Sequence, residues 1–140
     1  MRVNRKIFSS LVAFNDLSLR VVSELKGGKN NRVLLVATAM GKLYILKKYY
    51  QHIHDLRDRM RTEYQALSFL STHQFSCVPK PIAFDAEKNA ALYEYIQGKR
   101  INSEKIKNTH INQLLEFICH LYQVSQTVQA KNFSDASDAC

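Results

Sequence analysis

The sequence predicts an α+β fold, with a five-stranded, mostly antiparallel sheet, a helix packed on that sheet and a further C-terminal helix. Two patterns support this prediction. Three strand-like segments follow one another with short turns between them, which is typical of an antiparallel meander. A long segment with helical apolar spacing and neither Gly nor Pro then precedes two more strand-like segments.

The first part of the chain is expected to form a short helix and three strands. Apolar residues recur at helical spacing over residues 4–14, at Ile7, Phe8, Leu11 and Phe14. Alternating or β-branched apolar residues predict strands over 18–25, 32–38 and 43–50. The Gly-containing segments 26–30 and 40–42 supply the turns that separate these strands.

The second part is expected to contain a long helix, two strands and a last helix. The long helix covers residues 54–73, and Pro79 and Pro81 exclude its continuation. The remaining elements are strands over 82–85 and 90–96 and a helix over 110–128. A change to polar composition near Gly98 divides the chain into residues 1–97, which hold the sheet, and residues 98–140.

The net charge of +8 is concentrated in the first part of the chain. Residues 1–62 hold thirteen Lys and Arg against four acidic residues, whereas residues 63–140 hold seven against eight. Such a basic half can bind a polyphosphate ligand, nucleic acid or an acidic membrane surface, or it can be a solvated surface without a ligand. The basic residues are spread over several elements without interleaved stacking aromatics, which argues against nucleic acid.

The cysteines indicate a reduced, cytoplasmic environment. Cys77, Cys119 and Cys140 are far apart and lack the spacing of a metal site or a disulfide framework. No apolar run approaches the roughly 18 residues that a membrane-spanning helix needs. A cytoplasmic protein without a membrane segment is therefore expected.

A lysine and a glutamate are predicted to form an ion pair between the sheet and the long helix. In the strand over 43–50, Lys47 shares a face with Leu43 and Ile45, because alternate side chains point the same way. The helix carries Glu63 within its apolar stripe of Leu56, Met60, Leu67 and Leu70. A buried carboxylate needs a partner, and Lys47 is the natural one. The alternative is that both side chains reach solvent at the edge of the sheet.

The turn before the second strand contains the pair Gly27 and Gly28. Glycines there can present backbone N–H groups to a phosphate without a side chain in the way, although a plain hairpin turn is the simpler explanation of this feature taken alone. Neither Gly28-Lys29 nor Gly41-Lys42 follows another glycine at the spacing of a Walker P-loop, so that motif is excluded.

Five stretches occur in one order over about residues 20 to 100: Leu25–Val33, Leu43–Lys47, Arg61–Leu67, Val78–Pro81 and Leu92–Gly98. In this order and spacing, the chain resembles the aminoglycoside phosphotransferase and choline kinase group, whose fold is related to that of protein kinases. The resemblance implies a kinase-like N-terminal lobe that binds ATP. It leaves the phosphate acceptor open among aminoglycosides, choline, homoserine and sugar-like compounds.

The resemblance also implies a role for each residue of the ATP site. These residues are Gly27, Gly28 and Asn31 in the loop over the nucleotide, Ile45 against adenine, Lys47 on the α- and β-phosphates, Glu63 orienting Lys47, and Glu94, Tyr95 and Ile96 as the hinge whose backbone bonds adenine.

The chain departs from the family pattern after residue 100. A complete member has an HxDxxxxN loop, which supplies the proton acceptor and a magnesium ligand, and a further metal-binding Asp; this sequence contains neither. We therefore expect the ATP-binding lobe of a truncated or partial small-molecule phosphotransferase, inactive alone and using magnesium only with a complete second lobe.

Two other functions remain open. The chain can be a non-catalytic binding or regulatory module of kinase-like fold, or a basic nucleic-acid-binding domain. The apolar face of the helix over 110–128 is consistent with a missing lobe, with folding back on the sheet or with self-association.

Overall fold

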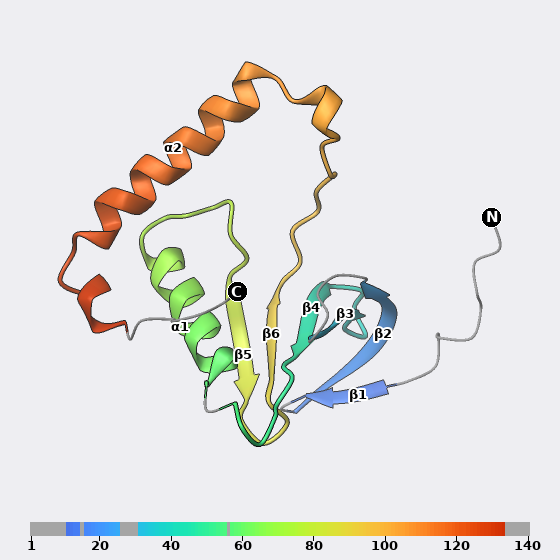
Figure 1. Ribbon diagram of the computed structural model, residues 1–140. Helices are drawn as coiled ribbons and strands as arrows, with labels where there is room; N and C mark the ends of the chain where they lie inside the picture. Colours follow the sequence, from blue (N-terminus) through green and yellow to red (C-terminus); the bar gives the residue numbers. More distant parts are fainter. Residues whose placement is uncertain (1–10, 15, 26–30, 56, 134–140) are drawn as a thin grey trace. The chain divides into compact units, whose positions relative to one another are not determined.

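The computed structural model describes residues 11–14, 16–25, 31–55 and 57–133 (Figure 1). The chain divides into two units, one ending at Ile96 and one beginning at Gln97. The first unit contains β1 (Leu11–Phe14), β2 (Leu17–Leu25), β3 (Arg32–Ala37), β4 (Leu43–Lys48), α1 (Arg59–Thr72), β5 (Pro81–Asp85) and β6 (Ala90–Glu94). The second contains the helix α2 (Asn108–Ser125) and the short 3₁₀ helices η1 (Ser103–Lys105) and η2 (Ala130–Asn132).

Within the described residues, the strands form one six-stranded sheet in the order β1-β2-β3-β4-β6-β5, with every neighbouring pair antiparallel. The α+β class is therefore confirmed. The sheet is nearly closed, because Phe14 of the edge strand β1 shares a core cluster with Ala83 of the opposite edge strand β5. Lys88, in the turn that follows β5, also donates a hydrogen bond to the carbonyl of Ala13 at 3.3 Å.

The sixth strand replaces part of an expected helix. The prediction of a helix over 4–14 is wrong for Leu11–Phe14, which pair with β2; residues 4–10 lie outside the described ranges. Spacing of three residues between Leu11 and Phe14 fits a helix, but four residues cannot define a period. Phe14 is buried in the core, and burial of this side chain by pairing with β2 decides the local structure.

The other elements of the first unit are confirmed with shifted ends. The five predicted strands agree with β2 to β6 to within two residues at each end. The helix expected over 54–73 begins only at Arg59, because Asp58 caps it by accepting a hydrogen bond from the backbone N–H of Arg61 at 3.0 Å.

The sheet has two different apolar faces. One face lines the nearly closed interior and buries Phe14, Leu19, Val21, Leu34, Val36, Leu46, Ala90 and Leu92. The other face meets α1 through Tyr49, Met60, Ala91 and Tyr93, with Ile45, Tyr64 and Leu67 packed around them. Alternation along β4 assigns Leu46 to the first face and Ile45 to the second, as the sequence predicts.

In the second unit, α2 agrees with the helix expected over 110–128 except that it ends at Ser125, so Val128 is not helical. Its apolar side chains that this unit does not bury are Ile111, Leu114, Leu115, Ile118, Leu121 and Tyr122. Across the described part of the chain, no helix is long and apolar enough to cross a membrane.

Candidate functional site

Lys47 lies near the end of β4, on the face of the sheet that meets α1. Antiparallel pairing places it opposite Val33 of β3 and opposite Ala91 of β6. This register is set by a tight β3–β4 turn, in which Gly41 has a φ of 81° and donates its N–H to the carbonyl of Thr38 at 2.9 Å. The basic side chain is thereby fixed over a largely apolar surface.

Glu63 lies in the second turn of α1 and points toward β4. Met60, one turn earlier, is buried against the sheet, and Leu67, one turn later, packs on the same cluster. Lys47 Nζ donates to Glu63 Oε2 at 2.5 Å. The predicted ion pair is confirmed, and it is partly buried, with the Lys47 side chain 21% and the Glu63 side chain 37% exposed.

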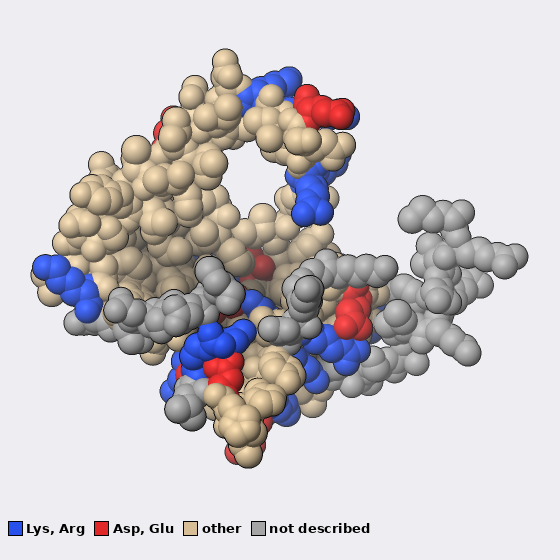
Figure 2. All heavy atoms as spheres, viewed as in Figure 1, with Lys and Arg blue, Asp and Glu red and all other residues tan. Residues whose placement is uncertain are grey.

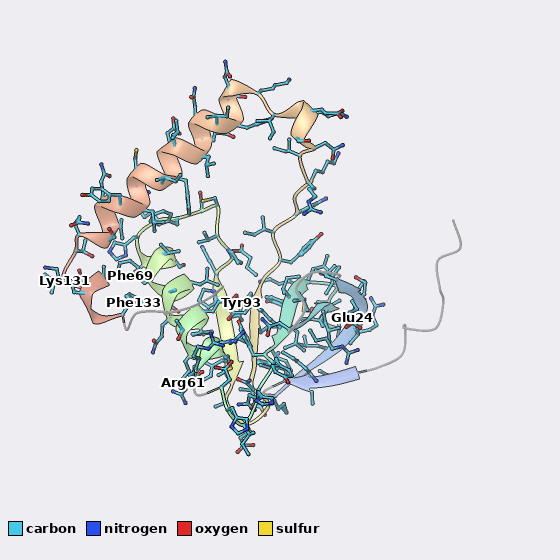
Figure 3. All side chains as sticks on the ribbon, viewed as in Figure 1. Glu24, Arg61, Phe69, Tyr93, Lys131 and Phe133 are labelled. Carbon is cyan, nitrogen blue, oxygen red and sulfur yellow. The ribbon has the colours of Figure 1, made fainter. Side chains whose placement is uncertain are left out.

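Two tyrosines that the sequence analysis did not select complete this group. The Lys47 ammonium lies 4.8 Å from the centre of the Tyr49 ring. The Tyr49 and Tyr93 hydroxyl oxygens are 2.7 Å apart and share a hydrogen bond. Tyr93, labelled in Figure 3, belongs to β6 and packs in the same cluster as Met60 of α1. Alternation could have found Tyr49, which follows Lys47 by two residues, but the partnership with Tyr93 depends on the pairing of β4 and β6.

Burial keeps both tyrosines protonated. Removal from water and the hydrogen bond to Tyr93 raise the pKa of Tyr49 far above its usual range. Burial likewise raises the pKa of Tyr93 to about 12. The charged groups at this point of the molecule are therefore Lys47 and Glu63, and the tyrosines contribute neutral rings and hydroxyls.

The expected nucleotide-covering loop lies partly outside the described residues, which include Asn31 but neither Gly27 nor Gly28. The Asn31 Oδ1 accepts a hydrogen bond from the backbone N–H of Tyr50 at 3.1 Å, which ties the start of β3 to the segment after β4. Leu25, the last residue of β2, pairs with Val33, the strand partner of Lys47. The flanks of the loop therefore lie at the Lys47 end of the sheet.

The expected hinge residues continue from β6 into the connection between the two units. Glu94 is the last residue of β6, and its backbone N–H is already bonded to the carbonyl of Lys80 at 2.8 Å. Its side chain accepts a hydrogen bond from the Lys80 N–H at 3.2 Å. Tyr95 and Ile96 follow β6 in the chain. Ile45 of β4 lies opposite Tyr93 of β6. The adenine-contacting roles of these residues remain predictions.

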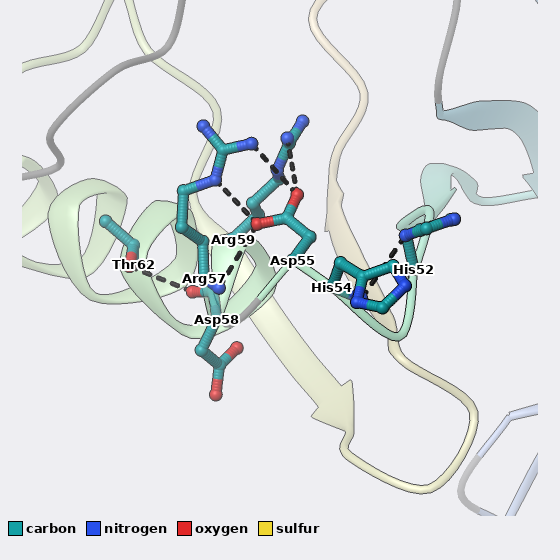
Figure 4. Close-up of polar contacts among 7 residues, drawn as sticks. All are labelled: His52, His54, Asp55, Arg57, Asp58, Arg59 and Thr62. Atoms are coloured by element: carbon teal, nitrogen blue, oxygen red, sulfur yellow. Dashed lines mark hydrogen bonds and ion pairs between the residues drawn. The ribbon is translucent and has the colours of Figure 1, made fainter.

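A second charged cluster lies in the connection that leads into α1 (Figure 4). Asp55 accepts hydrogen bonds from the guanidinium groups of Arg57 and Arg59, and those from Arg57 contribute most to holding the pKa of Asp55 well below its usual range. A cavity of about 330 Å³ lies beside these residues and extends to Asn89, but neither Lys47 nor Glu63 lines it. Because the charges of this cluster are already paired with one another, we interpret it as part of the structure at the start of α1 and not as a ligand-binding site.

Six ion pairs neutralise part of the positive charge of the described residues. The pairs are Arg32–Glu24, Lys47–Glu63, Arg57–Asp55, Arg59–Asp55, Arg61–Asp58 and Lys88–Asp85. On the face drawn in Figure 2, acidic side chains accordingly lie against basic ones. Among the described residues on this face, the interspersed arrangement differs from the continuous basic stripe that is typical of nucleic-acid-binding surfaces.

Comparison with known proteins gives a family match over most of the chain. Residues 21–139 match the sequence model of the phosphotransferase enzyme family, abbreviated APH. No curated protein matches the chain. The matched residues include the second part of β2, all of β3 to β6, α1 and α2.

Proposed function

Because the chain belongs to the phosphotransferase enzyme family, we propose that residues 1–97 form an ATP-binding lobe of a small-molecule kinase. Kinases of this family use ATP. In the proposed complex, Lys47 contacts the α- and β-phosphates and Glu63 holds its ammonium in place. Residues 98–140 form the connector and the first helix of the acceptor-binding lobe.

The observation that carries this proposal is the Lys47–Glu63 ion pair. A solvated surface pair would leave both side chains free to move, whereas this pair is partly buried between β4 and α1. Ile45 lies on the same face two residues before Lys47, where it is available to an adenine ring. The flanks of the Gly27-Gly28 loop lie at the same end of the sheet, so backbone N–H groups of that loop are proposed to reach the phosphates.

We propose further that these 140 residues do not transfer phosphate by themselves. The sequence contains no HxDxxxxN loop, so it lacks that source of a proton acceptor and a magnesium ligand. Positioning of ATP by Lys47 does not replace those groups, because charge neutralisation at the γ-phosphate needs them. Metal-dependent ATP consumption by the purified chain, lost on Lys47→Ala, would overturn this part of the proposal.

Calorimetric titration with ATP tests the binding site. Lys47→Ala is expected to weaken ATP binding by about 10- to 100-fold, because a hydrogen bond to a charged group contributes about 1.5–3 kcal/mol. Lys48→Ala is the matched control, since Lys48 is the next residue on β4 and its side chain points to the other face. No detectable ATP binding by the unmodified chain, or equal losses in the two variants, would refute the assignment.

A non-catalytic binding module is the alternative. The apolar side chains of α2 that its own unit leaves exposed favour this reading, because such a face is typical of an interaction surface. Sedimentation of the purified chain separates the possibilities: self-association that is lost on Leu114→Glu supports the module, whereas a monomer that binds ATP supports the lobe.

A further inference from the structure

The backbone of Tyr49 is held in place although β4 ends one residue earlier. Its N–H donates to the carbonyl of Asn89 at 2.9 Å, and the side-chain amide of Asn89 donates to the Tyr49 carbonyl at 3.0 Å. Asn89 has a φ of 46°, a conformation that Asn adopts more readily than most residues. The turn between β5 and β6 therefore clamps the residue that follows the end of the lysine strand.

The Tyr49 side chain is fixed at both of its ends. Its backbone is clamped by Asn89, and its hydroxyl is bonded to that of Tyr93. Tyr49 and Tyr93 are 6% and 3% exposed, so neither hydroxyl has water as an easy substitute partner. A ring that only filled space would not need a buried hydroxyl with a dedicated partner, because Phe fills nearly the same volume without a desolvation cost.

We propose that Tyr49 is a positioning residue that holds the Lys47 ammonium for the nucleotide phosphates, with Tyr93 fixing its ring. This inference rests on the proposed ATP site. The electron-rich face of the ring stabilises the ammonium electrostatically, in addition to the ion pair with Glu63. Lys47 is thereby held by two side chains.

A neutral ring suits this position better than a second acidic group. The ammonium has three N–H donors, and Glu63 accepts one of them at 2.5 Å. The ring adds attraction without adding negative charge that would repel a phosphate. Burial keeps the pKa of both tyrosines above the physiological range, so no tyrosinate forms to neutralise Lys47.

A double-mutant cycle on ATP affinity tests the inference. Tyr49→Leu is expected to weaken ATP binding by roughly 5-fold, the loss expected for a partly desolvated cation–π contact. In a Lys47→Met background, the same substitution is expected to have no further effect, because the group that it positions is gone. A role in packing alone would give the same fold-change in both backgrounds, and that result overturns the proposal.

Tyr44→Leu is the matched control. Tyr44 lies on β4 with its side chain on the other face, and the Lys42 ammonium lies 5.2 Å from its ring centre. Its replacement is expected to leave ATP affinity unchanged, provided that the variant remains folded. A loss that matches Tyr49→Leu would show that any aromatic residue of β4 has this effect, and would overturn the assignment.

The cycle also separates this inference from the proposed function. If Lys47→Met binds ATP as tightly as the unmodified chain, the ATP site itself is wrong. If Lys47→Met weakens binding and Tyr49→Leu weakens it by the same further factor in either background, only the positioning role fails.

If Tyr49→Leu does not fold, Tyr93→Phe replaces it in the cycle. That variant keeps the Tyr49 ring and releases its hydroxyl, and it is expected to weaken ATP binding by about 2-fold only when Lys47 is present.

Discussion

Substituting Lys47 and Glu63 first singly and then together measures how strongly their ion pair couples α1 to the sheet. At the observed separation of 2.5 Å, the Coulomb energy is about 1.7 kcal/mol at the dielectric constant of water and about 6.6 kcal/mol at an effective value near 20. Ordering the Lys47 side chain costs about 2 kcal/mol, and partial desolvation of both groups offsets more of the attraction. We expect a net coupling of about 1–2 kcal/mol.

The assay is urea unfolding of Lys47→Met, Glu63→Gln and the double variant, in which the coupling is the departure from additivity. The control is the same cycle on Arg32 and Glu24, which join β3 and β2 in two parallel hydrogen bonds at 3.0 and 3.1 Å. Those side chains are 59% and 44% exposed, so their coupling is expected to be only about 0.2–1 kcal/mol.

Salt provides a second comparison between the two pairs. Raising the ionic strength is expected to reduce the Arg32–Glu24 coupling more than the Lys47–Glu63 coupling, because exposed charges are screened more fully. A Lys47–Glu63 coupling no larger than that of the control, or equally sensitive to salt, would refute the reasoning from burial. The Lys47–Glu63 pair would then couple α1 to the sheet no more strongly than an exposed ion pair does.

Three further outcomes follow from burial and from the pKa shifts. Leu92→Ala in the closed interior is expected to cost about 2–5 kcal/mol of unfolding free energy, whereas Ile82→Ala, at a side chain that is 44% exposed, should cost less than about 1 kcal/mol in the same urea titration. The pKa of Asp55 is lower in the folded state than its ordinary value of 3.8, so this carboxylate stabilises the fold at pH values above 3.8. That contribution is lost as the pH falls through the folded-state pKa. The unfolding free energy of Asp55→Asn should therefore decrease less on acidification than that of the unmodified chain. The raised pKa of Tyr93 acts in the opposite direction, because its contribution to stability is complete below pH 10.0 and is lost as the pH rises toward about 12. The unfolding free energy of Tyr93→Phe should therefore decrease less at alkaline pH than that of the unmodified chain.

The fold could be predicted from sequence wherever the pattern was long enough to define a period. The strands β2 to β6 each span at least five mainly apolar residues, and turn residues mark their ends. The strand β1 has four residues, and what decides its structure is the burial of Phe14 against residues that come much later in the chain. The start of α1 was missed for a different reason, since the hydrogen bond from the Arg61 N–H to the Asp58 side chain, and not the apolar spacing, marks where the helix begins.

The candidate site was predictable where it depends on periodicity and not where it depends on strand pairing. Lys47 and Glu63 were found because one alternates along a strand and the other repeats along a helix. Tyr49 and Tyr93 are 44 residues apart, and their hydroxyls meet only because β6 lies beside β4. No local pattern indicates such a pair.

The register of β4 links the stability of the sheet to the proposed function. A slip of one residue would turn Lys47 into the closed interior and expose Leu46, which is fully buried. Burying an unpaired ammonium among Leu34, Val36 and Leu92 would cost far more than any contact it could gain there. The same packing that closes the interior therefore forces Lys47 onto the face where Glu63 and Tyr49 meet it. The orientation that a phosphate-binding role requires of Lys47 thus follows from the packing of the core, which already excludes the other orientation.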